Sequence, residues 1–202
     1  MKILVIGATG TIGKAIVSAL EGKHTIIKAS RTQGDVLIDI SCPNSIKRAF
    51  EQLTDLDAVI CATGSVAFAP FSKMTREQWD IGINGRLMGQ IHLAQQAAKM
   101  LNDNGSITLT TGIIADHPIA TGISAATLSG AIHHFVHHVA LELPQGIRIN
   151  CVSPSVLTES LDIYADYFPG FRSISAKEVA QYYVRSVEGV ETGKVFKAYV
   201  NN

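Results

Sequence analysis

The sequence GATGTIG, residues 7–13, places three glycines between a short apolar run and an amphipathic segment. Gly7, Gly10 and Gly13 would let the backbone approach a bound pyrophosphate, and the N-terminus of the following helix would offer free N–H groups and a partial positive charge. A tight strand-to-helix turn also favours glycine for purely structural reasons, which is the alternative. The position directly after the first predicted strand favours nucleotide binding.

Short apolar runs alternate with amphipathic segments along the rest of the chain. We predict strands at 3–7, 25–30, 57–64, 106–111, 147–153 and 195–200, and helices at 11–20, 44–53, 75–101, 124–143 and 176–188. This order predicts an α/β fold: a Rossmann-like, doubly wound parallel sheet flanked by helices in three α/β/α layers. With no internal repeat or linker, residues 1–202 are expected to form a single dinucleotide-binding domain. The irregular segments 112–122 and 155–175 follow predicted strands and are the expected pocket walls.

The composition and charge of the chain limit the kinds of molecule that it is expected to bind. The chain has 202 residues, 47% of them hydrophobic, and its 17 Lys and Arg balance 17 Asp and Glu. A balanced charge argues against nucleic acid or a membrane surface and favours a small molecule or a second copy. Cys42, Cys61 and Cys151 are odd in number and far apart, which predicts free thiols and a cytoplasmic protein.

The second predicted strand ends in Ser30 and Arg31, without an acidic residue. A carboxylate at this place selects the free 2′-hydroxyl of NAD(H), whereas an arginine accommodates the 2′-phosphate of NADP(H). The guanidinium suits phosphate oxygens, and a serine hydroxyl can add a hydrogen bond. The sequence therefore favours NADP(H) over NAD(H), with a solvated surface arginine as the alternative.

The order of these motifs resembles the short-chain dehydrogenase/reductase family along the full chain. GATGTIG has the GxxGxxG spacing of the family's extended and atypical branches, CATG (61–64) resembles its NNAG segment, and IRINCVSPSVLTE (147–159) resembles the turn that holds the nicotinamide. The resemblance implies that Asp39 and Ile40 meet the adenine. The expected cofactor-binding residues are Gly7, Thr9, Gly10, Thr11, Ile12, Gly13, Ser30, Arg31, Asp39, Ile40, Ala62, Thr63, Gly64, Pro154 and Leu157.

The catalytic positions of the family are mostly replaced. VALEL (139–143) resembles the family's LALEL and fixes a register in which the catalytic tyrosine and lysine fall on Ala125 and Ser129. The catalytic serine falls on Gly112, next to Thr111, while Asn84 matches the asparagine of the tetrad. In the nicotinamide turn, the family's threonine falls on Glu159, beside Thr158.

Several side chains are candidates to replace the missing proton donor. Histidine is a common proton donor in enzymes, and a threonine offers a hydroxyl, so the expected catalytic residues are Asn84, Thr111 and His117. Tyr164 and Tyr167 are weaker candidates for a lid that supplies a phenol. The i,i+4 histidine pairs His133/His137 and His134/His138 have a spacing that can bind zinc, but no third ligand is evident, so we expect a polar or interface face and no metal.

The resemblance implies an NADP(H)-binding oxidoreductase with a degenerate active site, acting on an unknown carbonyl or alcohol. The alternative is a non-catalytic NADPH-binding or NADPH-sensing module that acts through a partner. A third reading is a structural protein with a disused nucleotide fold, which would bind neither dinucleotide. By the same resemblance, we expect a homodimer or homotetramer formed through the two long helices.

Overall fold

A computed structural model describes residues 1–199 of the chain. Seven parallel strands form one sheet in the order β3-β2-β1-β4-β5-β6-β7. The strands are β1 (Lys2–Ile6), β2 (Thr25–Ser30), β3 (Val36–Leu37), β4 (Leu56–Cys61), β5 (Leu101–Thr110), β6 (Arg148–Pro154) and β7 (Val195–Ala198). The order reverses direction after β1, which confirms the predicted doubly wound, Rossmann-like α/β fold.

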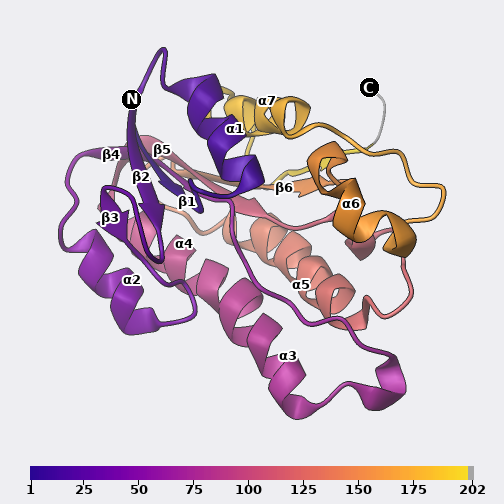
Figure 1. Ribbon diagram of the computed structural model, residues 1–202. Helices are drawn as coiled ribbons and strands as arrows, with labels where there is room; N and C mark the ends of the chain where they lie inside the picture. The colour runs from indigo at the N-terminus through magenta and orange to yellow at the C-terminus, as the bar shows by residue number, and fades with distance from the viewer. Residues whose placement is uncertain (200–202) are drawn as a thin grey trace.

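Helices cover both faces of this sheet, as Figure 1 shows. On one face, α1 (Thr11–Leu20) packs beside α7 (Ala176–Glu188). On the other lie α2 (Pro43–Phe50), α4 (Gly89–Met100) and α5 (Ile123–Val139). Each face has its own apolar cluster, with Ile16 and Tyr183 in one and Phe50, Leu93 and Ile132 in the other.

The long helix predicted at 75–101 is divided into three parts. It consists of α3 (Arg76–Gly82), the π-helix η2 (Ile83–Met88) and α4. Thr75 begins α3 with a capping box in which its side chain and that of Gln78 satisfy each other's backbone N–H. A π-helical turn is rare and often lies at a functional site, so η2 marks a place to examine.

Some predicted boundaries differ from the structure. Helix α5 ends at Val139 rather than residue 143. Strand β3 was not predicted, because its two residues are too few to show an apolar pattern. β5 begins at Leu101, and its pairing with β4 shifts register between Leu56 and Ala58. Residue 200, predicted to end the last strand, lies outside the described residues.

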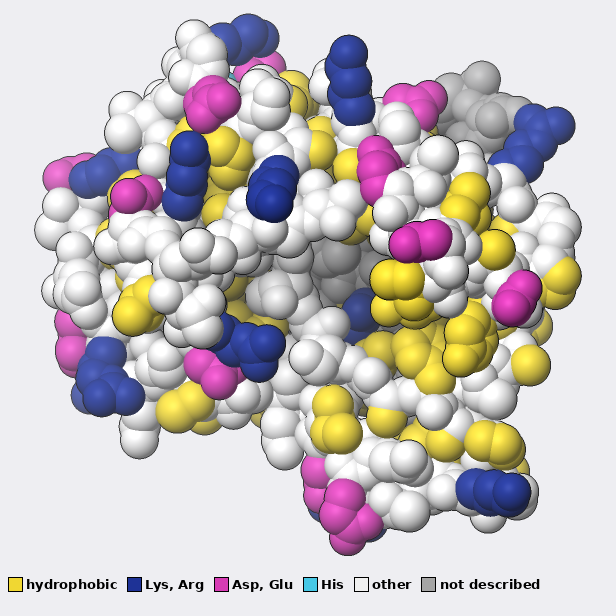
Figure 2. Space-filling model, in the orientation of Figure 1, with side chains coloured by type: hydrophobic (Ala, Val, Ile, Leu, Met, Phe, Trp, Pro, Cys, Tyr) yellow, Lys and Arg dark blue, Asp and Glu magenta, His cyan; other side chains and the backbone are white. Residues whose placement is uncertain are grey.

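Short helices complete the carboxyl edge of the sheet. These are η1 (Phe71–Lys73), η3 (Ile113–Ala115), η4 (Thr158–Ser160), α6 (Leu161–Tyr164) and η5 (Ala165–Tyr167). Figure 2 shows the molecule hollowed between the part that carries α1 and α2 and the part that carries α6, with apolar side chains gathered over α6. Within residues 1–199, no helix has the length and apolar character needed to cross a bilayer.

Candidate functional site

The glycine-rich turn is as tight as its sequence predicts. Gly7 has φ +85°, and a Cβ there would lie 2.6 Å from the carbonyl oxygen of Ala62. A Cβ on Gly13 would lie 1.9 Å from the carbonyl oxygen of Gly7, so the start of α1 packs directly onto the turn. The N-cap of α1 is Gly10, and its first turn, which contains Thr11, Ile12 and Gly13, carries no acidic residue. Its terminal N–H groups are therefore available to an anion.

A cavity of about 780 Å³ opens in front of this turn. Predicted site residues among its lining are Gly7, Thr9, Gly10, Ser30, Arg31, Asp39, Ile40, Ala62, Thr63, Gly64 and Asn84. The structure thus brings together residues from the carboxyl ends of β1, β2 and β4. Ser65, from the segment after β4, and Glu77, Asp80 and Ile81 of α3 also line this cavity and were not predicted, because no sequence motif marks them.

The end of β2 is organised by Ser30. Its hydroxyl donates to the carbonyl oxygen of Gln33 at 2.5 Å and accepts the Gln33 N–H at 3.1 Å, so it holds the following turn in place. Arg31 is exposed on that turn. A hydrogen bond from the Ser41 hydroxyl lowers the pKa of Asp39; burial opposes this, and the Ser41 N–H and the charge of Arg31 lower the pKa further. The cavity wall therefore carries an ionised carboxylate beside an exposed guanidinium.

Asn84 lies in the π-helix η2 and faces the same cavity. Its backbone carbonyl accepts the N–H of Gly89, the i→i+5 bond of a π-turn. A Cβ on Gly89 would lie 2.7 Å from the carbonyl oxygen of Ile40 and 3.0 Å from that of Asn84. A glycine at this position therefore lets η2 come close to the segment that carries Asp39 and Ile40.

The turn after β6 is tied to the segment before α7. Pro154 is buried at the end of β6, and Leu157 pairs with Ile174 in an isolated bridge. The Glu159 carboxylate accepts the N–H of Ala176 at 2.9 Å and so caps α7. Within residues 1–199, Pro154 and Leu157 are absent from the lining of the 780 Å³ cavity, unlike the other predicted strand-end residues.

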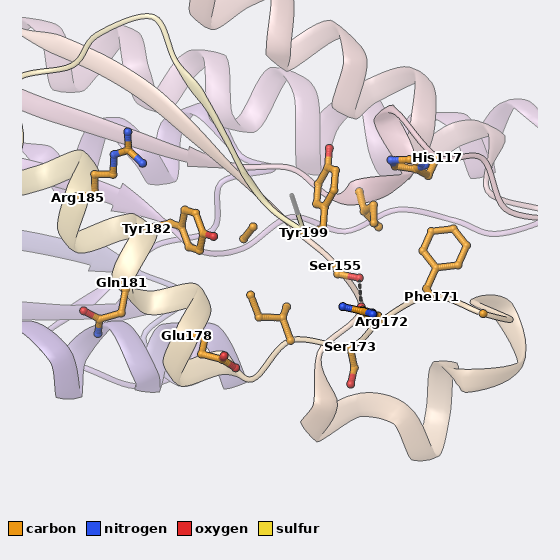
Figure 3. Close-up of a pocket in the computed structure, with 14 residues that line it drawn as sticks. His117, Ser155, Phe171, Arg172, Ser173, Glu178, Gln181, Tyr182, Arg185 and Tyr199 are labelled. Carbon is orange, nitrogen blue, oxygen red and sulfur yellow. Dashed lines mark hydrogen bonds between the residues drawn. The ribbon is translucent and has the colours of Figure 1, made fainter. Parts of the chain in front are cut away.

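A second cavity, of about 1010 Å³, lies at the carboxyl ends of β6 and β7. Figure 3 shows Tyr182 and Arg185 of α7 on one side, Tyr199 in the middle and His117 with Phe171 on the other. The expected pocket walls, residues 112–122 and 155–175, both contribute to it.

His117 lines this second cavity and packs edge-on against Phe171 and Tyr199. Its neighbour Asp116 accepts hydrogen bonds from the Tyr199 hydroxyl and from Lys197, the latter at 2.8 Å. Burial alone would raise the pKa of Asp116, but these partners lower it overall, whereas burial and Asp116 raise the pKa of Tyr199. Tyr199 was not singled out from the sequence, because its partner is far away in the chain.

Thr111 is buried and lines neither of the two cavities formed by the described residues. Its hydroxyl lies 2.9 Å from Nε2 of His133 and 3.2 Å from the Cys151 thiol. His133 is also buried, which lowers its pKa. Of the four helix histidines expected on a polar or interface face, His133 instead packs inside the chain against Thr111. No group of three or more His, Cys, Asp or Glu residues within 1–199 could hold a metal ion.

The positions of the missing tyrosine and lysine are both closed off. Ala125 is 1% exposed and belongs to an apolar cluster with Ile113 and Ile114, against which Phe168 and Phe171 pack. Ser129 is 0% exposed. The two tyrosines considered as a lid pack elsewhere: Tyr167 lies 6.1 Å from Phe68 and 6.4 Å from Tyr164, measured between ring centroids.

Sequence comparisons identify relatives of the chain. A family model described as enoyl-(acyl carrier protein) reductase matches residues 7–197. L-xylulose reductase of Mesocricetus auratus is 26% identical over 179 residues, which cover 79% of this chain and 73% of that protein. An uncharacterised oxidoreductase of Methylorubrum extorquens is 27% identical over 181 residues, covering 77% and 73% of the two chains.

Solved structures share the whole fold. Protein lin1944 of Listeria innocua is 46% identical, with a TM-score of 0.97 over 98% of this chain and 100% of that one. A small-chain dehydrogenase in complex with NADPH superposes with a TM-score of 0.87 at 24% identity, over 98% and 95% of the two chains, and shows likeness of fold.

Proposed function

The chain belongs to the short-chain dehydrogenase/reductase family, and on that premise we propose that it is an NADP(H)-dependent oxidoreductase acting on a carbonyl or alcohol substrate. The observation that carries this proposal is the 780 Å³ cavity. It joins the glycine-rich turn, the Ser30-Arg31 turn and Asp39 along one wall. Arg31 follows β2, at the place where this fold binds the adenosine ribose of a dinucleotide.

The residues present fit such a cofactor. The backbone at Gly7 and Gly13 approaches so closely that a Cβ at either position would overlap a carbonyl oxygen, which leaves the N-terminus of α1 open to a pyrophosphate. Arg31 would bind the 2′-phosphate, and the ionised Asp39 would accept a hydrogen bond from the adenine amino group. When bound, NADP(H) supplies or takes up the hydride.

We propose Asn84 and His117 as the residues nearest the reacting atoms. They line the first and the second cavity, respectively. The second cavity would take the substrate, because it follows Pro154 and Ser155 at the carboxyl edge of the sheet. Thr111 would act as a positioning residue through its contact with His133. The degenerate site remains part of this proposal, as does the cytoplasmic location, which the three free thiols support.

A second candidate is a non-catalytic NADPH-binding module that acts through a partner. It is favoured by the burial of Ala125 and Ser129, which leaves neither position a chemically competent side chain. The two candidates share the cofactor and differ in turnover. General acid catalysis typically contributes about 100-fold to 10,000-fold, so a slow enzyme remains compatible with its loss.

The test is a fluorescence titration with NADPH and NADH of the native protein and of Arg31→Ala. We expect the native protein to prefer NADPH, and the variant to lose about 10-fold to 100-fold of that preference, the worth of a charged hydrogen bond. Arg48→Ala removes an exposed arginine from α2 and is the matched control, expected to change neither affinity.

A screen of generic aldehydes, ketones and alcohols with the bound cofactor then separates the candidates. Oxidation of NADPH or reduction of NADP⁺ supports the enzyme. Tight binding without turnover across the screen supports the module, and failure to bind either dinucleotide refutes both.

A further inference from the structure

Arg86 is a partly buried cation without an anionic partner. It lies in η2, two residues after Asn84. One guanidinium nitrogen donates to the carbonyl oxygen of Gly64 at 3.2 Å, while Nε is shielded from solvent and finds no partner within residues 1–199. None of the ion pairs formed by the described residues includes Arg86.

The groups around Arg86 are neutral. Its guanidinium lies near the side chains of Cys61, Cys151 and Tyr183. Burial raises the pKa of both thiols to about 12 and raises that of the Tyr183 phenol, so all three stay protonated at neutral pH. Burial also lowers the pKa of Arg86, but a guanidinium keeps its proton in proteins. The positive charge is therefore uncompensated by its surroundings.

The side chain is held at the middle of the carboxyl edge of the sheet. Gly64 has φ +153°, and a Cβ there would lie 3.5 Å from Cα, Cβ and Cγ of Arg86, so the arginine stem packs on the Gly64 backbone. Cys61 and Cys151 belong to β4 and β6, the strands on either side of β5. Gly64, which accepts the Arg86 hydrogen bond, and Gly85, its neighbour in η2, line the first cavity, so the guanidinium lies beside that cavity.

Two buried serine hydroxyls on the helix packed against η2 also lack partners among residues 1–199. Helix α5 packs against η2. Its Ser124 and Ser129 hydroxyls are fully buried, and in the described part of the chain neither has a hydrogen-bond partner. Unsatisfied buried polar groups are rare in native proteins, and each calls for an explanation such as a bound molecule or water.

The energetic argument points to an anion from outside the chain. An unpaired buried charge is costly, and an apolar side chain of similar size would avoid that cost. The anionic groups of NADP(H) already have places in the proposed function, at the α1 N-terminus and at Arg31. The remaining anion is one carried by the substrate, and a carboxylate matches the planar guanidinium with two parallel hydrogen bonds.

We propose that Arg86 binds a carboxylate of the substrate, so that the substrate class is keto acids and hydroxy acids. This inference rests on the proposed function for the cofactor, but the anion site itself can be tested without it.

The first experiment uses two probes of nearly the same shape, acetoacetate and the neutral 2,4-pentanedione. Calorimetric titration of the NADP⁺-loaded protein should give at least about 10-fold tighter binding of acetoacetate, as expected for a charged hydrogen-bonded pair. Arg86→Met should abolish the preference, and Arg86→Lys, which keeps the charge but not the fork, should retain only part of it. Equal affinity of the native protein for both probes overturns the proposal.

Arg172→Met is the matched control, because Arg172 is an exposed arginine that lines the second cavity. It should leave the preference intact. Loss of the preference in this variant but not in Arg86→Met would assign the anion site to Arg172 and refute the proposal. A large loss of NADP⁺ affinity in Arg86→Met, with the probe preference unchanged, would assign Arg86 to the cofactor and refute it equally.

The second experiment is independent of the cofactor. Thermal melts without dinucleotide compare sodium acetate with sodium chloride at equal ionic strength. Acetate should raise the Tm of the native protein and of Arg172→Met but not that of Arg86→Met, since a ligand that binds only the folded state stabilises it. A Tm shift that is the same in all three proteins overturns the proposal. The expected pattern of Tm shifts in a protein that does not bind NADPH would refute only the cofactor assignment.

Discussion

At the scale of single residues, Gln90 shows how the site is joined to the sheet. It is 0% exposed, and its amide pairs with the backbone of Thr110: Oε1 accepts the N–H at 2.8 Å and Nε2 donates to the C=O at 2.9 Å. Nε2 also donates to the carbonyl of Arg86 at 3.2 Å. One side chain therefore completes the end of β5 and fixes the turn that carries Asn84 and Arg86.

Gln90→Ala leaves a buried N–H and a buried C=O of Thr110 without partners. We expect a loss of about 1–3 kcal/mol in the free energy of unfolding, measured in urea. Gln52→Ala removes an exposed glutamine that bonds only within α2 and should stay within about 0.5 kcal/mol of the native protein. Equal effects of the two substitutions would contradict the role given to Gln90.

His133 gives the stability of the fold a predictable pH dependence. Burial holds its folded-state pKa below the ordinary value of about 6.5, partly offset by Asp116. The unfolded chain therefore binds the proton more readily, so stability is complete above the unfolded pKa and falls as the pH decreases below it. The urea concentration at the midpoint of unfolding should therefore fall as the pH is lowered from neutrality to about 5.

His133→Gln can keep a hydrogen bond to Thr111 and should flatten this part of the pH profile. His134→Gln removes an exposed histidine from the same helix and should leave the profile unchanged. An unaltered acid slope in His133→Gln would show that other groups cause it.

At the scale of elements, the π-helix η2 depends on two glycines that place it against its neighbours. A Cβ on Gly82 would lie 2.4 Å from Cδ1 of Leu128, a flexible side-chain end, whereas one on Gly89 would meet the backbone of Ile40. The second contact is harder to relieve, because a side chain can rotate away more easily than a backbone carbonyl can move.

Gly89→Ala should therefore destabilise the protein by about 1–3 kcal/mol and weaken NADPH binding, because it pushes η2 from the segment that carries Asp39. Gly130→Ala, inside α5, places its Cβ in open space among the described atoms and should stabilise by about 0.5–1 kcal/mol. Chemical unfolding and an NADPH titration measure both effects. Similar results for the two variants would contradict this reading of η2.

The elements that the sequence predicted best are those whose pattern is local. Helix α7 and strand β2 begin and end at the predicted residues, and both ends of α7 are marked locally by the N-cap Ser175 and the following Gly189. The π-turn and β3 were missed, since the first depends on packing against Ile40 and the second has two residues. In the same way, the glycine-rich turn was readable as a motif, whereas Arg86 became notable only through the absence of a partner among residues 1–199.

At the scale of the whole molecule, the two cavities divide the carboxyl edge of the sheet. The first lies over β1, β2 and β4, and the second at the ends of β6 and β7. Arg86 lies beside the first, where Gly64 accepts its hydrogen bond. If the proposed function holds, this arrangement separates recognition of the cofactor from recognition of the substrate, and substitutions in one cavity are expected to leave affinity for the ligand of the other largely unchanged.

Self-association is a prediction for the whole chain. We expect light scattering to give a dimer or tetramer formed through α4 and α5. The exposed His137 and His138 on α5 would lie in the contact. His137→Glu with His138→Glu should then shift the mass towards the monomer without changing the far-UV circular dichroism. A native protein that is monomeric at all concentrations would contradict this prediction.

The three thiols differ in accessibility, so that a fluorescent label can be attached to one of them selectively. Cys61 and Cys151 are buried and protonated, with pKa values of about 12, and so resist alkylation. Cys42 is half-buried at the N-cap of α2, and its N–H bonds to the carbonyl of Asp39, a residue of the cofactor cavity. A maleimide fluorophore should therefore attach at one position of the native chain. Its emission would follow dinucleotide binding without any engineered cysteine.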